Sequence, residues 1–328
     1  MLRAVARQVV RFILLMVAVS VVTFALVGSS PVDPVKMNTG QAAYGRMSEQ
    51  KREQLREYWG ADQPIPERYA RWAADVLHGD LGESLRYNAP VTQVLAQRAG
   101  NTLMLMAVAW VLSGVIGLAL GILSGACRGS WIDRLVRGYC FLLSSTPAFW
   151  LGLVALMVFS VWLGWFPFGF SVPIGVDAAT VSLAERLRHL VLPALTLSVT
   201  GVANVALHTR EKVVDVMESE YVRFALTRGE TRRQALIRHG FRNLVLPAIS
   251  LQFAQVSEIF GGSVLVEQVF SYPGLGQAAV TAGVGGDAPL LVGIALASAA
   301  IVFTGNLVAN ILYGVVDPRM REGVRAHA

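Results

Sequence analysis

Six runs of mostly apolar residues alternate with more polar stretches along the chain. They are Phe12–Ser29, Thr102–Cys127, Tyr139–Trp165, Leu190–Leu207, Leu244–Phe270 and Leu290–Val316. A helix needs about 20 apolar residues to cross the hydrocarbon core of a bilayer, so each run can span it. The fifth run is among the least uniform, because it contains Glu258 and Glu267. The pattern predicts an all-α membrane protein with about six transmembrane helices.

Composition agrees with this prediction. Of the 328 residues, 54% are hydrophobic and only 15% are charged, whereas a soluble domain carries about 25% charged residues. The net charge of +6 comes mainly from basic residues that flank the apolar runs, as membrane topology requires, so we expect lipid as a partner and no nucleic acid. Cys127 and Cys140 are expected to be free thiols on a reducing face.

The lysine and arginine residues of short loops indicate orientation, because they stay on the cytoplasmic side. In a six-span arrangement the basic loops and both ends fall on one side; they are residues 3–11, 128–137, 210–242 and 319–325. This predicts a membrane protein with both termini in the cytoplasm. We interpret the first run as an uncleaved anchor and not a signal peptide, because Val27-Gly28-Ser29 is a poor cleavage site.

These assignments divide the chain into four parts. Residues 1–30 form a tail and the first helix, residues 31–100 an extracytoplasmic segment, residues 101–316 a core of five helices with a loop at 211–242, and residues 317–328 a cytoplasmic tail. Within the external segment, Ser48–Tyr58 is expected to be an exposed helix and Glu67–Leu77 a helix with one apolar face. The segment is either a cap packed on the membrane helices or a docking surface for a substrate-delivery protein.

The loop between the fourth and fifth runs has strong local signals. Three apolar residues recur at helical spacing: Val222, Ala225 and Leu226. Gly229 stands where a left-handed glycine would end this first helix, and Thr231 with Gln234 forms a capping box for a second one. Such a unit can receive a push from a partner protein. It can equally lie as a basic amphipathic segment on anionic lipid, and the residues alone favour neither.

Enzymatic motifs do not occur in the sequence. None of the three lysines, Lys36, Lys51 and Lys212, follows a glycine, so the chain has no phosphate-binding loop. No H-E-x-x-H pair or G-x-S-x-G elbow is present, and no two histidines stand at metal-ligand spacing. We therefore expect no catalytic residues and no metal or cofactor bound by this chain.

Several short motifs together resemble one family, the permease subunits of bacterial ABC importers for peptides, nickel and opine-type metal chelates. They are Asp33-Pro34, Asp62-Gln63-Pro64, Gly79–Ser84, Thr146–Trp150, His189–Ala194, Phe270–Gly276 and Asp317-Pro318-Arg319. The resemblance covers nearly the whole chain and implies that the protein lies in the bacterial inner membrane.

The most specific match is the cytoplasmic loop. The residues that resemble the ATPase-docking loop of the family are Tyr221, Val222, Arg223, Ala225 and Gly229, followed by Arg242-Asn243 and Leu246-Pro247. In ABC importers generally this loop begins Glu-Ala-Ala. Here Arg223-Phe224-Ala225 stands in that place, as is usual in the peptide and nickel branch, and the resemblance implies that these residues couple the pore to an ATPase.

The resemblance also implies partners and a mechanism. A second, homologous permease completes the pore, two cytoplasmic ATPases bind ATP and magnesium, and an external binding protein delivers a peptide or a nickel or opine-type chelate. The alternative is a secondary transporter or another carrier, which often shows inverted repeats that we do not find here. A membrane scaffold or enzyme is a third possibility.

Glu258 is the sharpest candidate for the translocation path. A carboxylate near the middle of a spanning helix costs about 2.5–3.5 kcal/mol, so it should face protein or water. Asn306 and Asn310 share a face of the sixth run and are its expected polar neighbours, whereas Glu267 is expected at the membrane interface. Glu258 either pairs with a neighbouring helix or permease, or lines the path and meets a cationic group of the substrate.

The last candidates follow the fifth run. They are Tyr272, Pro273, Gly274, Leu275 and Gly276, and their Pro-Gly pair predicts a turn. In the permeases that this chain resembles, the stretch lies near the external mouth of the pore. The alternative is a plain connecting turn.

Overall fold

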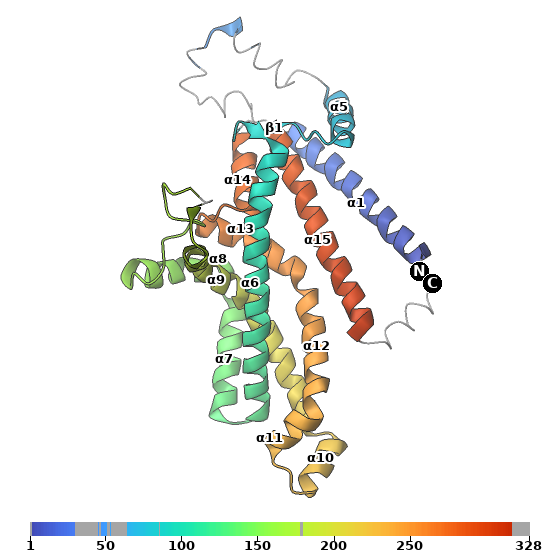
Figure 1. Cartoon of the computed structure of the whole chain (residues 1–328), viewed down its shortest axis with the longest axis vertical. Helices are drawn as coiled ribbons and strands as arrows, with labels where there is room; N and C mark the ends of the chain where they lie inside the picture. Colours follow the sequence, from blue (N-terminus) through green and yellow to red (C-terminus); the bar gives the residue numbers. More distant parts are fainter. Residues whose placement is uncertain are drawn as a thin grey trace. The chain divides into compact units, whose positions relative to one another are not determined.

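The computed structural model describes residues 2–29, 64–84, 86–177 and 180–316, with a few positions between 45 and 53. Most of the predicted helix Ser48–Tyr58 and the tail after Val316 lie outside the described residues. Within the described part, four helices are long and apolar enough to cross a membrane, or six if each of two bent pairs counts as one span. The predicted all-α membrane class is therefore confirmed (Figure 1).

The chain divides into two units, which are described separately. The first comprises Met1–Thr102 and Pro273–Phe303, and the second comprises Leu103–Tyr272 and Thr304–Ala328. Two long helices contribute to both: α6 (Val91–Ala126) and α15 (Ala288–Val316).

In the first unit, α5 (Ile65–Leu77) packs on α1 (Leu2–Gly28). The ring centroid of Phe24 lies 5.5 Å from that of Tyr69 and 5.8 Å from that of Trp72. The Tyr69 hydroxyl also forms a hydrogen bond with Ser20, at 2.9 Å. The helix predicted at Glu67–Leu77 is thus confirmed, and its apolar face covers the end of the first helix.

A short hairpin of β1 (Glu83–Ser84) and β2 (Ala89–Pro90) precedes α6, and its Ala89 packs against the core of the first unit. Residues of α6, α14 (Leu275–Gly285) and α15 fill it: Val91, Val94, Leu275, Ala278, Leu290 and Ile294. Asp287 begins α15, accepting hydrogen bonds from the Leu290 amide and, at 2.6 Å, from the Ser84 hydroxyl. The sequence pattern did not predict α14, which is too short and too rich in small residues to stand out.

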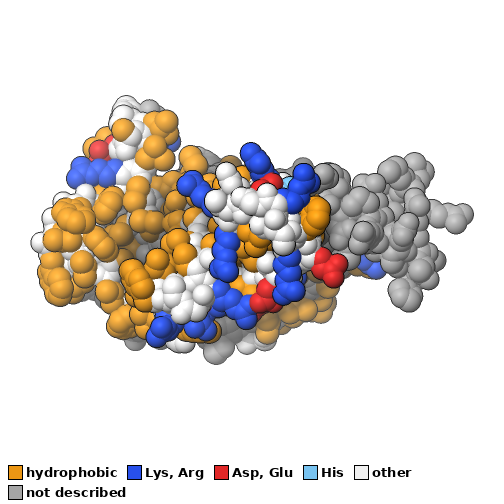
Figure 2. Space-filling view, turned by 90° about the horizontal axis from the view of Figure 1, so that it is seen from below, with side chains coloured by type: hydrophobic (Ala, Val, Ile, Leu, Met, Phe, Trp, Pro, Cys, Tyr) orange, Lys and Arg blue, Asp and Glu red, His pale blue; other side chains and the backbone are white. Residues whose placement is uncertain are grey.

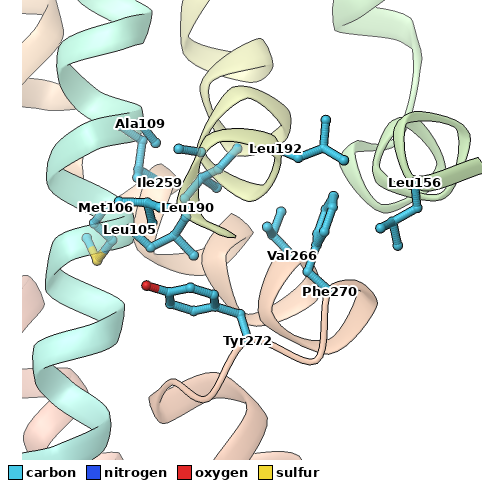
Figure 3. Close-up of a cluster of buried hydrophobic side chains, with 12 residues drawn as sticks. Leu105, Met106, Ala109, Leu156, Leu190, Leu192, Ile259, Val266, Phe270 and Tyr272 are labelled. Carbon is cyan, nitrogen blue, oxygen red and sulfur yellow. The ribbon is translucent and has the colours of Figure 1, made fainter. Parts of the chain in front are cut away.

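In the second unit, α9 (Leu183–Met217) is the central helix. Its neighbours are α7 (Trp131–Ser145), α8 (Ala148–Ala155), α12 (Phe241–Ala254) and α13 (Val256–Val269). Of its most apolar stretch, 67% is buried within the chain, against 11% for α1, so α9 faces protein and α1 faces outward. Side chains of α6, α9, α13 and their neighbours form the core shown in Figure 3.

Four of the predicted runs cover only part of the helix found there, the first because α1 begins at Leu2 and not at Phe12. The second run begins too late, because α6 starts at Val91 in a polar stretch that need not lie in lipid. The fourth is too short at both ends, since α9 begins after Ser182, whose hydroxyl accepts from the Glu185 amide at 3.3 Å. The third begins too late, at Tyr139 and not at Trp131.

Two runs predicted as single helices are bent pairs. The third bends by 105° between α7 and α8, where Thr146 is extended because Pro147 follows it; the second part ends in a π-helical turn, Leu156–Trp162. The fifth bends by 52° at Gln255, between α12 and α13.

A row of glycines joins α6 to α9 within the second unit. A methyl group on Gly117, Gly121 or Gly125 would lie 2.7, 2.5 and 2.5 Å from the Cβ atoms of Val205, Thr209 and Val213, respectively. The glycines recur every four residues, the spacing at which small residues let membrane helices approach closely. We call this contact the α6–α9 seam; its spacing is visible in the sequence but did not enter the prediction.

Candidate coupling site and translocation path

The loop between the fourth and fifth runs begins with α10 (Glu220–Thr227), near one end of α9 (Figure 1). Gly229 follows it with a φ of +91°, and the chain reverses there: the Gly229 amide donates to the Leu226 carbonyl at 3.0 Å and the Glu230 amide to the Ala225 carbonyl at 3.2 Å. This pair of bonds is the Schellman motif. The predicted left-handed glycine at the end of the first loop helix is confirmed.

The predicted capping box is confirmed as well. The Thr231 hydroxyl accepts from the Gln234 amide at 3.3 Å, and the Gln234 side chain accepts from the Thr231 amide at 3.0 Å. The helix that it starts, α11 (Arg232–Ala235), is not a separate second helix. It continues through a π-helical turn, Leu236–Gly240, directly into α12, because no glycine or proline interrupts the backbone before Gly240.

One face of α10 is fixed to the rest of the second unit. Val222 is 0% and Ala225 5% exposed, and both belong to a cluster with Val213 and Val216 of α9 and with Leu236. These two predicted coupling residues are therefore packing residues. Their burial fixes which face of α10 is turned outward.

The opposite face of α10 is open. It carries Tyr221, Arg223 and Phe224, with the Phe224 side chain 64% exposed and the Arg228 guanidinium 5.8 Å from its ring centroid. The Tyr221 hydroxyl accepts from the Asn243 amide group at 3.1 Å. The sequence interpretation missed Phe224 as a surface residue, although its position off the Val222–Ala225 face was a usable signal.

Lys and Arg side chains surround this end of the second unit (Figure 2). Those on α10, α11 and the turn after them are Arg223, Arg228, Arg232, Arg233 and Arg238. An exposed aromatic side chain next to arginines is the composition of a protein-binding surface.

In the fifth run, Glu258 is exposed within this chain, and no described residue forms a hydrogen bond with its carboxylate. Its expected neighbour Asn306 bonds instead to the Ser257 hydroxyl, at 3.0 Å; the side chain of Asn310 lies outside the described residues. Glu267, which was expected at the membrane interface, is buried within the chain. Glu267 is 0% exposed, because it lies on the same helical face as the buried Ile259 and Ser263.

The candidates for the external mouth are mostly buried. The Leu275 side chain is 0% exposed and Tyr272 4%, and Gly274 and Gly276 are also buried, while Pro273 is half-buried. Within the first unit, Asn101 donates to the Pro273 carbonyl and Thr102 accepts from the Leu275 amide, both at 2.8 Å. In the second unit, burial and the nearby Glu267 raise the pKa of Tyr272 to about 12. Leu275 therefore packs in a core and is unsuitable for a pore-blocking label.

Comparison with known proteins identifies the family. Residues 117–322 match the model of the binding-protein-dependent transport system inner membrane component, and residues 1–106 match the N-terminal model of such membrane components. The chain belongs to this family.

Curated relatives align over almost their whole length. The chain is 34% identical to the oligopeptide transport system permease protein AppB of Bacillus subtilis (strain 168), over 96% of this chain and 98% of the relative. It is 33% identical to a putative peptide transport system permease protein of Brucella abortus (strain 2308), over 97% and 98%. It is also 33% identical to the glutathione transport system permease protein GsiC of Escherichia coli O6:H1, over 98% and 99%.

This binding-protein-dependent permease is thus a multi-pass inner-membrane subunit of an ABC importer, and its role is transport. The family works with an ATPase and a substrate-binding protein. Among the described residues, no three His, Cys, Asp or Glu side chains lie close enough together to hold a metal ion.

Proposed function

We propose that this chain forms half of the pore of a peptide importer and is driven through α10. A second permease completes the pore, two ATPases carry the ATP and magnesium, and an external binding protein supplies the peptide. The names of the three relatives support peptides, glutathione among them, over nickel or opine chelates. The basic end with α10, and both termini, face the cytoplasm, as the positive-inside rule requires.

The observation that carries the coupling proposal is the two-sided character of α10. Its inner face is packed through Val222 and Ala225, and its outer face presents Phe224 at 64% exposure. A helix fixed on one side and open on the other transmits a push from whatever binds its open side. Phe224, with Tyr221, Arg223 and Arg228 around it, is the anchor for an ATPase, since a large aromatic beside arginine is a frequent binding hot spot.

Replacement of Gly229 by Val tests this proposal. A methyl group at Gly229 would meet no atom within 4 Å, so only the backbone is affected: a β-branched residue resists the φ of +91° and the end of α10 shifts. We expect insertion in the membrane, loss of peptide uptake and weaker co-purification of the ATPase.

Phe224→Ala gives the same test without backbone strain, and we expect it to weaken ATPase binding by about 2 kcal/mol or more. The matched control is Ile237→Ala, an apolar residue 57% exposed outside α10, which should leave binding unchanged. Normal co-purification and uptake in both Gly229→Val and Phe224→Ala would rule out coupling through α10.

For the translocation path, we propose that Glu258 faces the pore or the second permease. An exposed carboxylate in the middle of a spanning run is costly in lipid, so its open side requires water or protein. The α-ammonium group of a peptide is a suitable cation for it. Asn306 and Asn310 of α15 remain our candidates for this path, and residues 272–276 remain our candidates for its external mouth.

A further inference from the structure

The buried carboxylate of Asp133 connects three helices of the second unit and lies outside the coupling site and the path described above. Asp133 lies in the first turn of α7 and is 1% exposed. Its Oδ1 accepts from the Ser124 hydroxyl of α6 and from Nε of Arg210 on α9, both at 2.6 Å. Its Oδ2 accepts from the second guanidinium nitrogen, at 2.8 Å, and from the Gly129 amide, at 2.9 Å.

Such a site fixes geometry more than it adds stability. A buried ion pair gives little net stability compared with well-packed apolar residues, because both charges lose their hydration. A guanidinium bound through two parallel hydrogen bonds, however, holds its partner in one direction and one plane. Asp133 also accepts hydrogen bonds from Ser124 of α6 and from the Gly129 amide of the α6–α7 turn. The carboxylate, and with it the Arg210 guanidinium, is therefore held in one orientation relative to both segments.

The position of Arg210 gives this geometry its importance. Arg210 lies two turns before the end of α9. In those turns, Val213 and Val216 belong to the same buried cluster as Val222 of α10. On the same stretch of α9, the α6–α9 seam ends at Gly125, where a methyl group would lie 2.9 Å from the Arg210 carbonyl oxygen. The end of α9 is therefore held at its backbone by the seam and at its side chain by Asp133.

A second ion pair joins the same segments on the outside. Arg128 of the α6–α7 turn pairs with Glu218 just after α9, with side chains 55% and 60% exposed. Exposed pairs of this kind contribute little, since water and salt screen them. The chain thus offers a buried and an exposed link between the same two segments, which makes a matched comparison possible.

We propose that Asp133 is a positioning residue for coupling, which makes the ends of α6, α7 and α9 one rigid lever behind α10. The proposal rests on the coupling role of α10 proposed above. With Asp133 in place, a displacement of α10 moves all three helices. Without it, the last turns of α9 bend and absorb the displacement, so ATP is hydrolysed without transport.

The test is Asp133→Asn in the complete transporter reconstituted in lipid vesicles. Asparagine keeps the size but turns an amide group, itself a donor, toward a guanidinium that only donates. We expect the ATPases to co-purify normally and basal hydrolysis to persist, while the number of peptides transported per ATP falls by about two- to thirtyfold, the range for positions that link coupled sites. A purely structural role would lower assembly and leave this ratio unchanged.

Three further variants complete the experiment. Glu218→Gln removes only the exposed pair and should leave the ratio unchanged. Arg210→Lys keeps the charge but loses the two-bond fork, and Ser124→Ala keeps the pair but removes one hydrogen bond, so both should lower the ratio by less than Asp133→Asn. If Asp133→Asn does not assemble, these two variants decide the matter.

A normal ratio in assembled Asp133→Asn would overturn the proposal, as would an equal loss in Glu218→Gln. If Asp133→Asn does not assemble, a normal ratio in both Arg210→Lys and Ser124→Ala overturns it. Failure of the coupling role of α10 itself gives a different result, because Gly229→Val and Phe224→Ala would then both bind the ATPase normally and transport normally.

Discussion

The α6–α9 seam and the α12–α13 junction both lie in the second unit, yet they are built in opposite ways. At the seam, Gly117, Gly121 and Gly125 bring the backbones so close that a single added methyl group would clash. Dispersion contacts dominate this packing, and the Thr209 hydroxyl is buried there without a hydrogen-bond partner among the described residues. At the junction, the helix is interrupted at Gln255 and polar side chains fill the space.

The polar groups of the junction are only partly satisfied. Gln252 donates to the Trp110 carbonyl and to the Ser113 hydroxyl at 2.7 Å, and the Trp110 ring nitrogen donates to the Gln252 carbonyl at 2.9 Å. Gln255 is 3% exposed, and its amide group has no hydrogen-bond partner among the described residues. Gly201 of α9 leaves room for it, since a methyl group there would lie 2.8 Å from the Gln255 amide oxygen.

The second unit can therefore change shape at lower cost at the junction than at the seam. Separating the seam loses packing that nothing in lipid replaces, whereas rearranging the junction releases an amide group that is already unsatisfied. The seam, continued by Asp133 toward α10, is the stiff part of the unit. The junction, next to Glu258, is the part that can rearrange.

The largest expected effect comes from Gly121→Leu at the seam. The new side chain would meet the Cβ of Thr209 at 2.5 Å and the carbonyl oxygen of Ala206 at 2.6 Å, and the backbone atom cannot move aside. We expect the variant not to fold, because the destabilisation exceeds the about 1–3 kcal/mol that overpacking usually costs. The measurement is the yield of monodisperse protein in detergent.

Gly138→Leu is the matched control, because a methyl group on this glycine of α7 meets no atom within 4 Å. Equal yields for the two variants would mean that the seam is not stiff, and the contrast with the junction would disappear.

A smaller and more selective effect is expected at Glu258 beside the junction. Glu258→Gln keeps the shape and removes the charge, so the transporter should assemble with normal basal ATP hydrolysis. Uptake of a peptide with a free amino group should fall about tenfold, equivalent to about 1.4 kcal/mol. The same peptide with an acetylated amino terminus serves as the control substrate, and its uptake should not change. Equal uptake of the peptide with a free amino group by the unchanged transporter and by Glu258→Gln would leave Glu258 with a structural role alone.

The smallest expected effect, and one of opposite sign, belongs to Gln255. Gln255→Leu replaces an unsatisfied buried amide group by an apolar side chain of similar size, so we expect the free energy of unfolding to rise by about 1–3 kcal/mol. Thermal unfolding in detergent measures it. Gln252→Leu is the comparison, and it should destabilise because it removes two hydrogen bonds. Similar destabilisation by both variants would show that the Gln255 amide group stabilises the fold as the Gln252 amide group does.

Much of the architecture follows from the sequence by itself. The membrane class depends on the length of apolar runs, and the cap at Gly229 and the capping box at Thr231 depend on a few neighbouring residues, so no distant contact is needed to predict them. The family also follows from short motifs, and the loop between the fourth and fifth runs was found in the right place. The sequence likewise placed a carboxylate, Glu258, near the middle of the fifth run, where the structure puts it in the first turn of α13.

The side of each helix that meets protein is set by tertiary packing and could not be predicted. It buried Glu267 and Leu275, opened Phe224 to the surface, and bent two runs at Pro147 and Gln255. It also joined Asp133 to Arg210, 77 residues away along the chain. Hydropathy is nearly uniform around a membrane helix, so a periodic pattern cannot tell a lipid-facing side from a buried one. That choice is made by close packing and by the hydrogen bonds of a few polar groups between helices.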